Sequence, residues 1–267
     1  MSSKYPELDQ VIMYIQNHLH EPISLSQLSH YAFYSPYHFI RIFKEQMGLT
    51  PQYYISSLRL QKAKELLLAT PFPVREVANE LGYQSLGTFT SRFSKSVGMT
   101  PSEFRSSGLH AEHHLRRLSE PAIWLPGHTT TLSLNDYIEG TVRSEIPFQG
   151  VVLVGLFRKP LPEGIPLYGT LARVNDSFRI SGVKPGVYYL MATSVSWKSK
   201  ANDILLPAYT LRTRSRAPII IKPGECAHQQ DVILYPPRLD DPPILISLTL
   251  LMQRLYRQFS SIGKHSN

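Results

Sequence analysis

The feature that most constrains this chain is a short pattern that occurs twice. Residues 35–51 read SPYHFIRIFKEQMGLTP and residues 85–101 read SLGTFTSRFSKSVGMTP, so the copies lie 50 positions apart and agree at six of seventeen positions. Each copy begins with serine, carries two phenylalanines four positions apart, and ends in Gly-x-Thr-Pro. Serine before a helix and glycine after it are capping signals, and residues four apart share one helix face. Each copy therefore predicts a helix that buries its phenylalanines.

A short helix is predicted directly before each copy. The apolar spacing in Leu25 to Ala32 and in Val74 to Leu81 is that of a helix, and only two and three residues separate these segments from the serines. Two helices joined by so short a turn form a helix-turn-helix, whose second helix enters the major groove of DNA. The sequence thus predicts two such motifs, near residues 25–46 and 74–97. The paired phenylalanines are interpreted as core rather than as base-stacking platforms: Phe39, Phe43, Phe89 and Phe93.

The segment between the copies sets their separation. Residues 51–68, PQYYISSLRLQKAKELLL, have a helical pattern behind a capping Thr50. At about 1.5 Å per residue, these eighteen residues extend about 27 Å. Major-groove faces on one side of DNA recur every ~34 Å. One rigid helix of this size can hold two reading heads near one DNA turn apart, so a single chain can do what many helix-turn-helix proteins need a dimer to do.

Taken together, these motifs carry a family resemblance. They are F-x-R-x-F-K before G-L-T-P, R-L-x-x-A-K-x-L-L over residues 59–67, and V-A-x-x-L-G-Y followed by F-x-x-x-F and G-M-T-P. They resemble the DNA-binding domain of AraC/XylS-type transcription regulators, over about residues 6–106. The resemblance implies an all-α double helix-turn-helix domain whose reading helices are residues 35–46 and 85–97. It also implies base-edge contacts from these positions: Tyr37, Ile40 and Arg41 in the first helix, and Gly87, Thr88, Thr90 and Ser91 in the second.

The basic side chains of this half divide into a base reader and phosphate contacts. The guanidinium of Arg41 can fork onto a guanine, which is worth about 1–3 kcal/mol of discrimination. In the second copy the matching position is Ser91, with Arg92 one step on, so Arg92 is expected to reach toward phosphate. The remaining phosphate candidates, which position the protein without specifying sequence, are Lys44, Lys95, Arg59 and Lys62. The alternative for these residues is an ordinary solvated helix face.

The second half of the chain has the residue pattern of β-strands rather than of helices. Short runs rich in Val, Ile, Tyr and Thr, such as VVLVGLF (151–157) and DVILY (231–235), alternate with turn sequences such as VKPG. We expect a DNA-binding domain over residues 1–108, a polar linker over 109–120, an antiparallel β-sandwich with a C-terminal helix over 121–259, and a disordered tail over 260–267. The stretch 178–192, FRISGVKPGVYYLMA, resembles transthyretin-like or carboxypeptidase-regulatory β-sandwiches. The family usually places its effector domain first, so this chain reverses the order.

Charge and composition bound the function without identifying it. The formal net charge is +8, but Lys and Arg outnumber Asp and Glu by only 10 to 8 in residues 1–108, against 16 to 10 in residues 121–267. The longest apolar runs are far shorter than the roughly 20 residues that span a bilayer, and the N-terminus lacks the apolar region of a secretory signal. A single cysteine, Cys226, suits a reducing compartment. These features predict a cytoplasmic protein that does not enter a membrane.

Three groups of residues outside the repeat are candidates for metal binding, reactivity or anion binding. For each group a purely structural role is the alternative. The triplet His110, His113 and His114 could hold zinc or lie in a solvated linker. Cys226 is either a reactive thiol or a plain strand residue. The alternating arginines could bind an anion or form the charged face of an edge strand: Arg212, Arg214 and Arg216.

No catalytic set, metal site or cofactor is expected in the β half, which is interpreted as a sensor or interaction module. The expected partner is double-stranded DNA, and further candidate partners are a small-molecule effector, RNA polymerase and a second copy of the chain. The C-terminal helix either covers the sandwich or pairs with that second copy. The rival hypothesis is an enzyme whose β half carries out the chemistry while the helical half tethers it to DNA.

Overall fold

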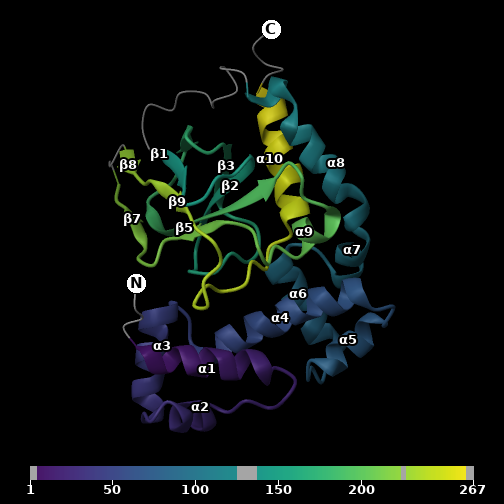
Figure 1. Ribbon diagram of the computed structural model, residues 1–267, viewed down its shortest axis with the longest axis vertical. Helices are drawn as coiled ribbons and strands as arrows, with labels where there is room; N and C mark the ends of the chain where they lie inside the picture. The colour runs from purple at the N-terminus through teal and green to yellow at the C-terminus, as the bar shows by residue number, and fades with distance from the viewer. Residues whose placement is uncertain (1–4, 125–136, 224–226, 263–267) are drawn as a thin grey trace. The chain divides into compact units, whose positions relative to one another are not determined.

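The computed structural model describes residues 5–124, 137–223 and 227–262, and these form two units (Figure 1). Unit 1 consists of Met1–Arg105 together with a short later stretch, Arg238–Leu245, and unit 2 consists of Ser106–Pro237 and Ile246–Asn267. Cys226 and the tail residues 263–267 lie outside the described residues. Within the described ranges, no helix is both long enough and apolar enough to cross a membrane.

Unit 1 is helical, as the sequence predicts. Its elements are α1 (Pro6–Asn17), α2 (Leu25–Tyr31), α3 (Pro36–Met47), α4 (Pro51–Ala69), α5 (Val74–Glu80), α6 (Leu86–Val97) and α7 (Pro101–Ser106). The pairs α2–α3 and α5–α6 are the two predicted helix-turn-helix motifs, and α4 is the predicted connecting helix. In Figure 1, α4 runs from the end of the unit that holds α1–α3 to the end that holds α5 and α6.

Short-range capping interactions place the ends of these helices. The hydroxyls of Ser35 and Ser85 accept hydrogen bonds from the backbone N–H groups three residues on, at 3.4 and 3.3 Å. Thr50 caps α4 in the same way, accepting from the N–H of Tyr53 at 3.4 Å. The glycines that follow α3 and α6 have left-handed backbones, with φ of 75° and 91°. These local signals explain why the helix boundaries are visible in the sequence.

The repeat extends from the sequence into the packing of aromatic rings. In the first module the Phe39 ring packs on Phe43 and Phe43 on Tyr54, with centroid distances of 5.6 and 5.7 Å. In the second module, 50 residues on, the corresponding distances are 5.7 and 5.8 Å: Phe89 to Phe93, and Phe93 to Phe104. All six rings have no exposed surface. Tyr54 lies on α4 and Phe104 on α7, so each module is closed by the helix that follows its reading helix.

The two turns differ by one residue and by backbone chemistry. In the second turn Gly82 takes the left-handed conformation, with φ of 75°, where a side chain is disfavoured. The corresponding left-handed residue in the first turn is Phe33, with φ of 57° and 93% of its surface exposed. A bulky residue in this conformation is unusual and is strained.

Unit 2 contains two β-sheets. Its strands are β1 (Tyr137–Ser144), β2 (Gly150–Phe157), β3 (Tyr168–Ala172), β4 (Ser177–Ser181), β5 (Gly186–Ser196), β6 (Arg212–Arg214), β7 (Ile219–Ile221), β8 (Ala227–Gln229) and β9 (Val232–Leu234). One sheet has the order β3-β2-β5-β6, with β7 also on β5, and its pairings are antiparallel. In the other, β1 pairs with β4 antiparallel but with β8 and β9 in parallel. This parallel pairing departs from the predicted antiparallel sandwich.

The inner faces of both sheets share one hydrophobic core, which includes Ile138 of β1, Val154 of β2 and Leu190 of β5. Every residue of β2 is buried. A strand buried on both faces explains why its sequence is an unbroken apolar run rather than an alternating one.

Helices α8 (Gly108–Ser119), α9 (Ala201–Leu205) and α10 (Leu248–Ile262) belong to the same unit, and a 3₁₀ turn, η1, spans Pro121–Trp124. α8 and α10 contact each other and lie side by side in Figure 1. The C-terminal helix thus covers part of unit 2.

Two segments differ from the sequence prediction. The expected linker, residues 109–120, is largely helix α8, which buries Ala111, Leu115 and Leu118. The C-terminal helix, expected over residues 244–259, begins at Leu248 and continues to Ile262. Ser247 stands before it, with a hydroxyl that accepts from the N–H of Leu250 at 3.3 Å. Such a hydroxyl cap starts the helix at this point rather than at the start of the apolar run.

Candidate nucleic-acid interface

One face of α3 carries the side chains predicted to read DNA. Tyr37 is 83% exposed, and Arg41 and Lys44 are also exposed, while Ile40 is half-buried at the edge of this face. The opposite face is entirely inside the unit, with Phe39, Ile42, Phe43 and Met47 having no exposed surface. The helix therefore presents one aromatic ring and two cations to solvent.

The corresponding face of α6 is chemically different. Gly87, Thr88 and Ser91 are exposed and Thr90 is partly buried, so this face is small and hydroxyl-rich. Lys95 is also exposed, one turn beyond Ser91. The structure therefore places the predicted positions of both reading helices on outward faces at corresponding places in the repeat.

Arg41 has a neighbour that the sequence reasoning missed. One of its guanidinium nitrogens, Nη2, lies 3.2 Å from Nδ1 of His38, one turn earlier on α3. The His38 ring in turn packs against the Tyr34 ring, with centroids 4.8 Å apart. These contacts hold Arg41 toward the start of the helix. The spacing of three residues between His38 and Arg41 was the available signal.

Gly87 is not required by the packing of unit 1. A Cβ built there would meet only the hydroxyl of Ser85, at an ordinary 3.7 Å, and Gly87 has no left-handed backbone. Glycine within a helix costs roughly 0.5–1 kcal/mol relative to alanine. A glycine that the fold does not need, on an exposed helix turn, suits a surface that another molecule approaches closely.

Arg92 extends beside α4. Its guanidinium carbon lies 6.0 Å from the centroid of the Tyr53 ring, and the residue is exposed. The guanidinium lies over the ring and stays accessible, a geometry compatible with the predicted reach toward phosphate. That role stays a prediction.

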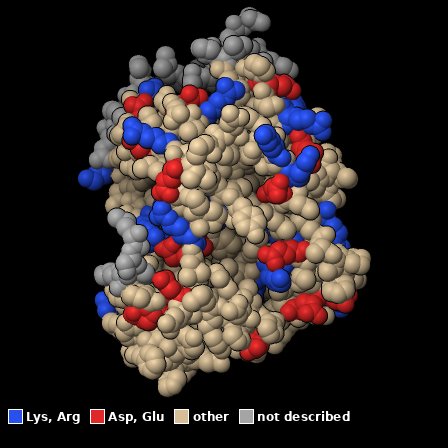
Figure 2. Space-filling view, viewed as in Figure 1, with Lys and Arg blue, Asp and Glu red and all other residues tan. Residues whose placement is uncertain are grey.

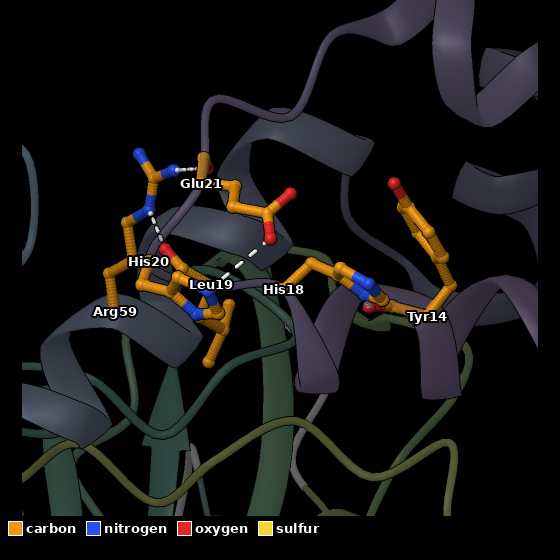
Figure 3. Close-up of polar contacts among 6 residues, drawn as sticks. All are labelled: Tyr14, His18, Leu19, His20, Glu21 and Arg59. Atoms are coloured by element: carbon orange, nitrogen blue, oxygen red, sulfur yellow. Dashed lines mark hydrogen bonds and ion pairs between the residues drawn. The ribbon is translucent and has the colours of Figure 1, made fainter.

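Arg59 fastens the loop between α1 and α2 (Figure 3). Its Nε donates to the carbonyl of Leu19 at 3.0 Å and its Nη2 donates to the carbonyl of Glu21 at 2.8 Å. Figure 3 also shows Tyr14 and His18, whose Nδ1 lies 2.8 Å from the Tyr14 carbonyl oxygen. These contacts make Arg59 a positioning residue for the first module, and its phosphate contact stays a prediction.

Arg105 has the same role in the second module, and the sequence reasoning missed it. Its Nε donates to the carbonyl of Leu67 at 2.9 Å, and its Nη2 donates to the carbonyl of Phe72. Arg105 therefore fastens the loop between α4 and α5. The two arginines have equivalent positions in the repeat. Arg59 on α4 holds the loop before α2, and Arg105 on α7 holds the loop before α5.

Unit 1 has little excess positive charge, since Lys and Arg outnumber Asp and Glu by only 10 to 8 in residues 1–108. Lys62, a phosphate candidate, forms an exposed ion pair with Glu65 at 3.0 Å. On the face in view, Figure 2 shows basic and acidic side chains interspersed among other residues over the region of unit 1. Specificity in such a surface would rest on individual side chains rather than on a strong overall field.

The other groups singled out in the sequence lie in unit 2. The His110 and His114 rings are 6.4 Å apart on α8, and burial, followed by the nearby His113, lowers the pKa of His114. No cluster of three or more potential metal ligands occurs among the residues that the structure describes. Arg212 donates through Nη2 to the carbonyl of Pro207 at 2.8 Å, which gives it a structural role in the preceding loop.

Comparison with known proteins places the similarity in the helical part. A family model described as a helix-turn-helix domain matches residues 28–107. An uncharacterized HTH-type transcriptional regulator, YobQ of Bacillus subtilis (strain 168), is 38% identical over 96 residues, which cover 36% of this chain and 40% of that protein. A probable transcriptional regulator, LumQ of Photobacterium leiognathi, is 36% identical over 104 residues, which cover 38% and 42%. The chain thus spans about two fifths of the length of these curated relatives.

Solved structures also match part of the chain. The C-terminal domain of AraT, a response regulator from Geobacillus stearothermophilus, is 30% identical with a TM-score of 0.37, covering 39% of this chain and 87% of that one. The DNA-binding domain of AdpA, a global transcriptional factor solved in complex with a target DNA, is 26% identical with a TM-score of 0.36, covering 43% and 98%.

Proposed function

We propose that this protein, whose residues 28–107 match a helix-turn-helix domain, is a sequence-specific transcription regulator of the AraC/XylS type that binds double-stranded DNA. The observation that carries the proposal is the pair of exposed helices α3 and α6, held in matching modules on one continuous helix of 19 residues. At about 1.5 Å per residue, that helix is about 28 Å long. This length suits two heads in successive major grooves, which recur every ~34 Å.

The two heads are proposed to read DNA differently. The first, with Tyr37 and Arg41, reads bases directly, and Arg41 oriented by His38 is the guanine reader. The second, with Gly87 and Thr88 at its start, allows the helix backbone to approach the groove closely. Phosphate contacts come from the cations around the heads: Lys44, Arg59, Lys62, Arg92 and Lys95.

Unit 2 is proposed to sense an effector. A cavity of about 340 Å³ lies beside α10 and is lined by Tyr168, Thr170 and Arg179 from the sheet region and by Leu251, Arg254 and Leu255 from α10. Arg179 pairs with Glu139 through Nη2, at 2.7 Å. The lining combines apolar side chains with polar ones, and the second guanidinium, that of Arg254, suits a small polar molecule with an anionic group.

The rival hypothesis of a DNA-tethered enzyme has less support. Asp203 is the carboxylate in a second cavity of unit 2, of about 300 Å³, and it already accepts a hydrogen bond from the N–H of Lys200, at 2.8 Å. It is thereby used as a helix cap.

The proposed function places the chain in the cytoplasm with the DNA. Contact with RNA polymerase and pairing with a second copy stay predictions.

Selection of bound duplexes from a random-sequence library tests the proposal. The wild-type chain should enrich a site with two parts about one helical turn apart. Arg41→Ala should relax the base preference at one position of one part, whereas Lys44→Ala should weaken all sequences about equally and lower the salt dependence by about one charge. Failure of the wild-type chain to enrich any motif would refute the proposed function.

A further inference from the structure

Unit 1 is completed by a stretch from the far end of the sequence, Arg238–Leu245, here called the strap. The strap follows β9 and Pro237 of unit 2, and the chain returns to unit 2 at Ile246, just before α10 begins at Leu248. The DNA-binding unit therefore contains eight residues whose two ends are both continuous with the proposed sensor. One of those ends leads directly into the helix that lines its cavity.

The strap is stiffened by local interactions. Its first four residues form a turn in which the N–H of Asp241 donates to the carbonyl of Arg238 at 3.0 Å, and the N–H of Arg238 donates to the Asp241 carboxylate at 2.9 Å. Two prolines follow and restrict the backbone. The next residues, Ile244 and Leu245, are 5% and 0% exposed. A stiff segment loses little conformational freedom when it docks.

The strap also provides a partner for a buried charge in α4. Lys64 has no exposed surface, and its Nζ donates to the carbonyl of Ile244 at 3.0 Å. The Phe104 ring, from the second module, lies with its centroid 5.6 Å from the same nitrogen. Lysine is rarely buried without partners, because its ammonium group loses its hydration. Departure of the strap would remove this carbonyl and expose Lys64 to water.

The carboxylate of Asp240 on the docked strap acts electrostatically on a carboxyl group of α1. Burial raises the pKa of the Asp9 carboxyl on α1, and the carboxylate of Asp240 on the strap raises it further. These two like charges weaken a position that the apolar contacts of Ile244 and Leu245 favour.

We infer that the strap is a regulatory latch on α4: when docked it keeps α4 rigid and the two reading heads correctly spaced, and when released it uncouples them. The inference rests on the proposed function. An effector that binds beside α10 would act on the latch through the chain itself, because α10 begins directly after the strap. Two heads held at the correct spacing bind a two-part site with a high effective concentration for the second contact. Release of the strap therefore weakens two-part binding while leaving binding to one part nearly unchanged.

Hydrogen exchange of the full-length chain, followed by mass spectrometry, tests the coupling. Leu245→Asp places a carboxylate at a fully buried position of the strap, and Leu239→Asp makes the same change at a strap position that is 39% exposed. Leu245→Asp should speed exchange at least tenfold both in the strap and in residues 60–68 of α4, with β2 and β5 unchanged. Leu239→Asp should resemble the wild type. Ile244→Ala is a milder variant that keeps the carbonyl bound by Lys64, and it should speed exchange in both segments together by a smaller factor.

DNA binding by the same variants tests the consequence. The probes are a duplex selected by the wild-type chain and a version with one part scrambled. Leu245→Asp should weaken binding to the intact duplex about tenfold and change binding to the scrambled one less than twofold. Faster exchange in the strap with unchanged exchange in α4 would overturn the latch, as would equal weakening on both duplexes. If the wild-type chain selects no duplex, the proposed function fails, and the exchange data still decide whether the strap and α4 open together.

Discussion

Replacing Lys64 by methionine removes a buried charge at nearly constant volume and should change how the stability of unit 1 depends on pH. Burial lowers the pKa of Lys64 from 10.5 to about 7, and the neighbouring Glu65 only partly opposes this. Between pH 7 and 10.5 the unfolded chain holds a proton that the folded chain has lost. The free energy of unfolding therefore rises with pH in this window, by about 1.4 kcal/mol per pH unit.

The size of the whole effect follows from the two pKa values. The difference between 10.5 and about 7 corresponds to on the order of 5 kcal/mol. This contribution is fully present above pH 10.5 and is lost as the pH falls through about 7. Below that pH the folded state carries the full cost of burying the ammonium group. Lys64→Met should abolish the slope, so the variant should exceed the wild type in stability at pH 6 by much more than at pH 10.

The control and the assay come from the same helix. Lys62→Met makes the same chemical change at an exposed, ion-paired position two residues away and should keep the wild-type slope. The reporter is Ala63→Cys at a fully buried position, made in a Cys226→Ser background so that it is the one thiol of the chain. The rate at which this thiol is labelled in urea, corrected for thiol ionisation, measures the opening of unit 1. Parallel pH curves for the wild type and Lys64→Met would show that the lysine is hydrated in the folded protein and that the reasoning is wrong.

Three further changes test the interface and the turns. Gly87→Ala should raise the free energy of unfolding of unit 1, measured by urea titration, by roughly 0.5 kcal/mol. The same change should weaken DNA binding, measured by fluorescence anisotropy, and tighter binding would contradict a close approach at this position. Phe33→Gly should stabilise unit 1 by about 0.5 kcal/mol, because it relieves left-handed strain of about 1–2 kcal/mol at the expense of added freedom in the unfolded chain. Arg105→Met should destabilise it by about 2 kcal/mol through the loss of two hydrogen bonds from a charged group, and Arg92→Met, at an exposed position, serves as the control, with less than 0.5 kcal/mol expected.

The helical unit was predictable because its determinants are local. Ser35, Thr50 and Ser85 cap their helices through contacts three residues away, and the buried phenylalanines repeat at helical spacing. Such signals depend on neighbours in the sequence rather than on distant partners. The outward position of Arg41 followed from the same periodicity. Its contact with His38 was also within reach of spacing alone.

The features that escaped prediction depend on distant partners. Helix α8 has a polar sequence, and its narrow apolar stripe gains partners from α9 and α10, which come about 90 and 140 positions later. The guanidinium of Arg117 on α8 packs 3.7 Å from the ring centroid of Tyr256 on α10. The parallel pairing of β1 with β8 and β9 also joins segments about 90 residues apart. No local pattern specifies such contacts.

The strap shows the same limit more sharply. Ile244 and Leu245 continue an apolar run that is helical from Leu248, so the periodicity gave no reason to separate them from the helix. Lys64 stands in a helix segment with polar neighbours, and its burial depends on a carbonyl 180 positions away. A lysine in such a segment is ordinarily assigned to solvent. Only the folded chain distinguishes it from Lys62.

Helix α4 belongs to both modules at once, since Tyr54 near its start completes the ring stack of the first and its far end leads into the loop that Arg105 holds in the second. Such sharing fixes the angular phase between the two halves of the repeat. Each residue inserted into or deleted from α4 would turn one half about 100° around the helix axis and shift it about 1.5 Å along it. Four residues would restore the phase to within about 40° but alter the span by about 6 Å. The length of this helix is therefore under tighter geometric control than the length of any surface loop in the unit.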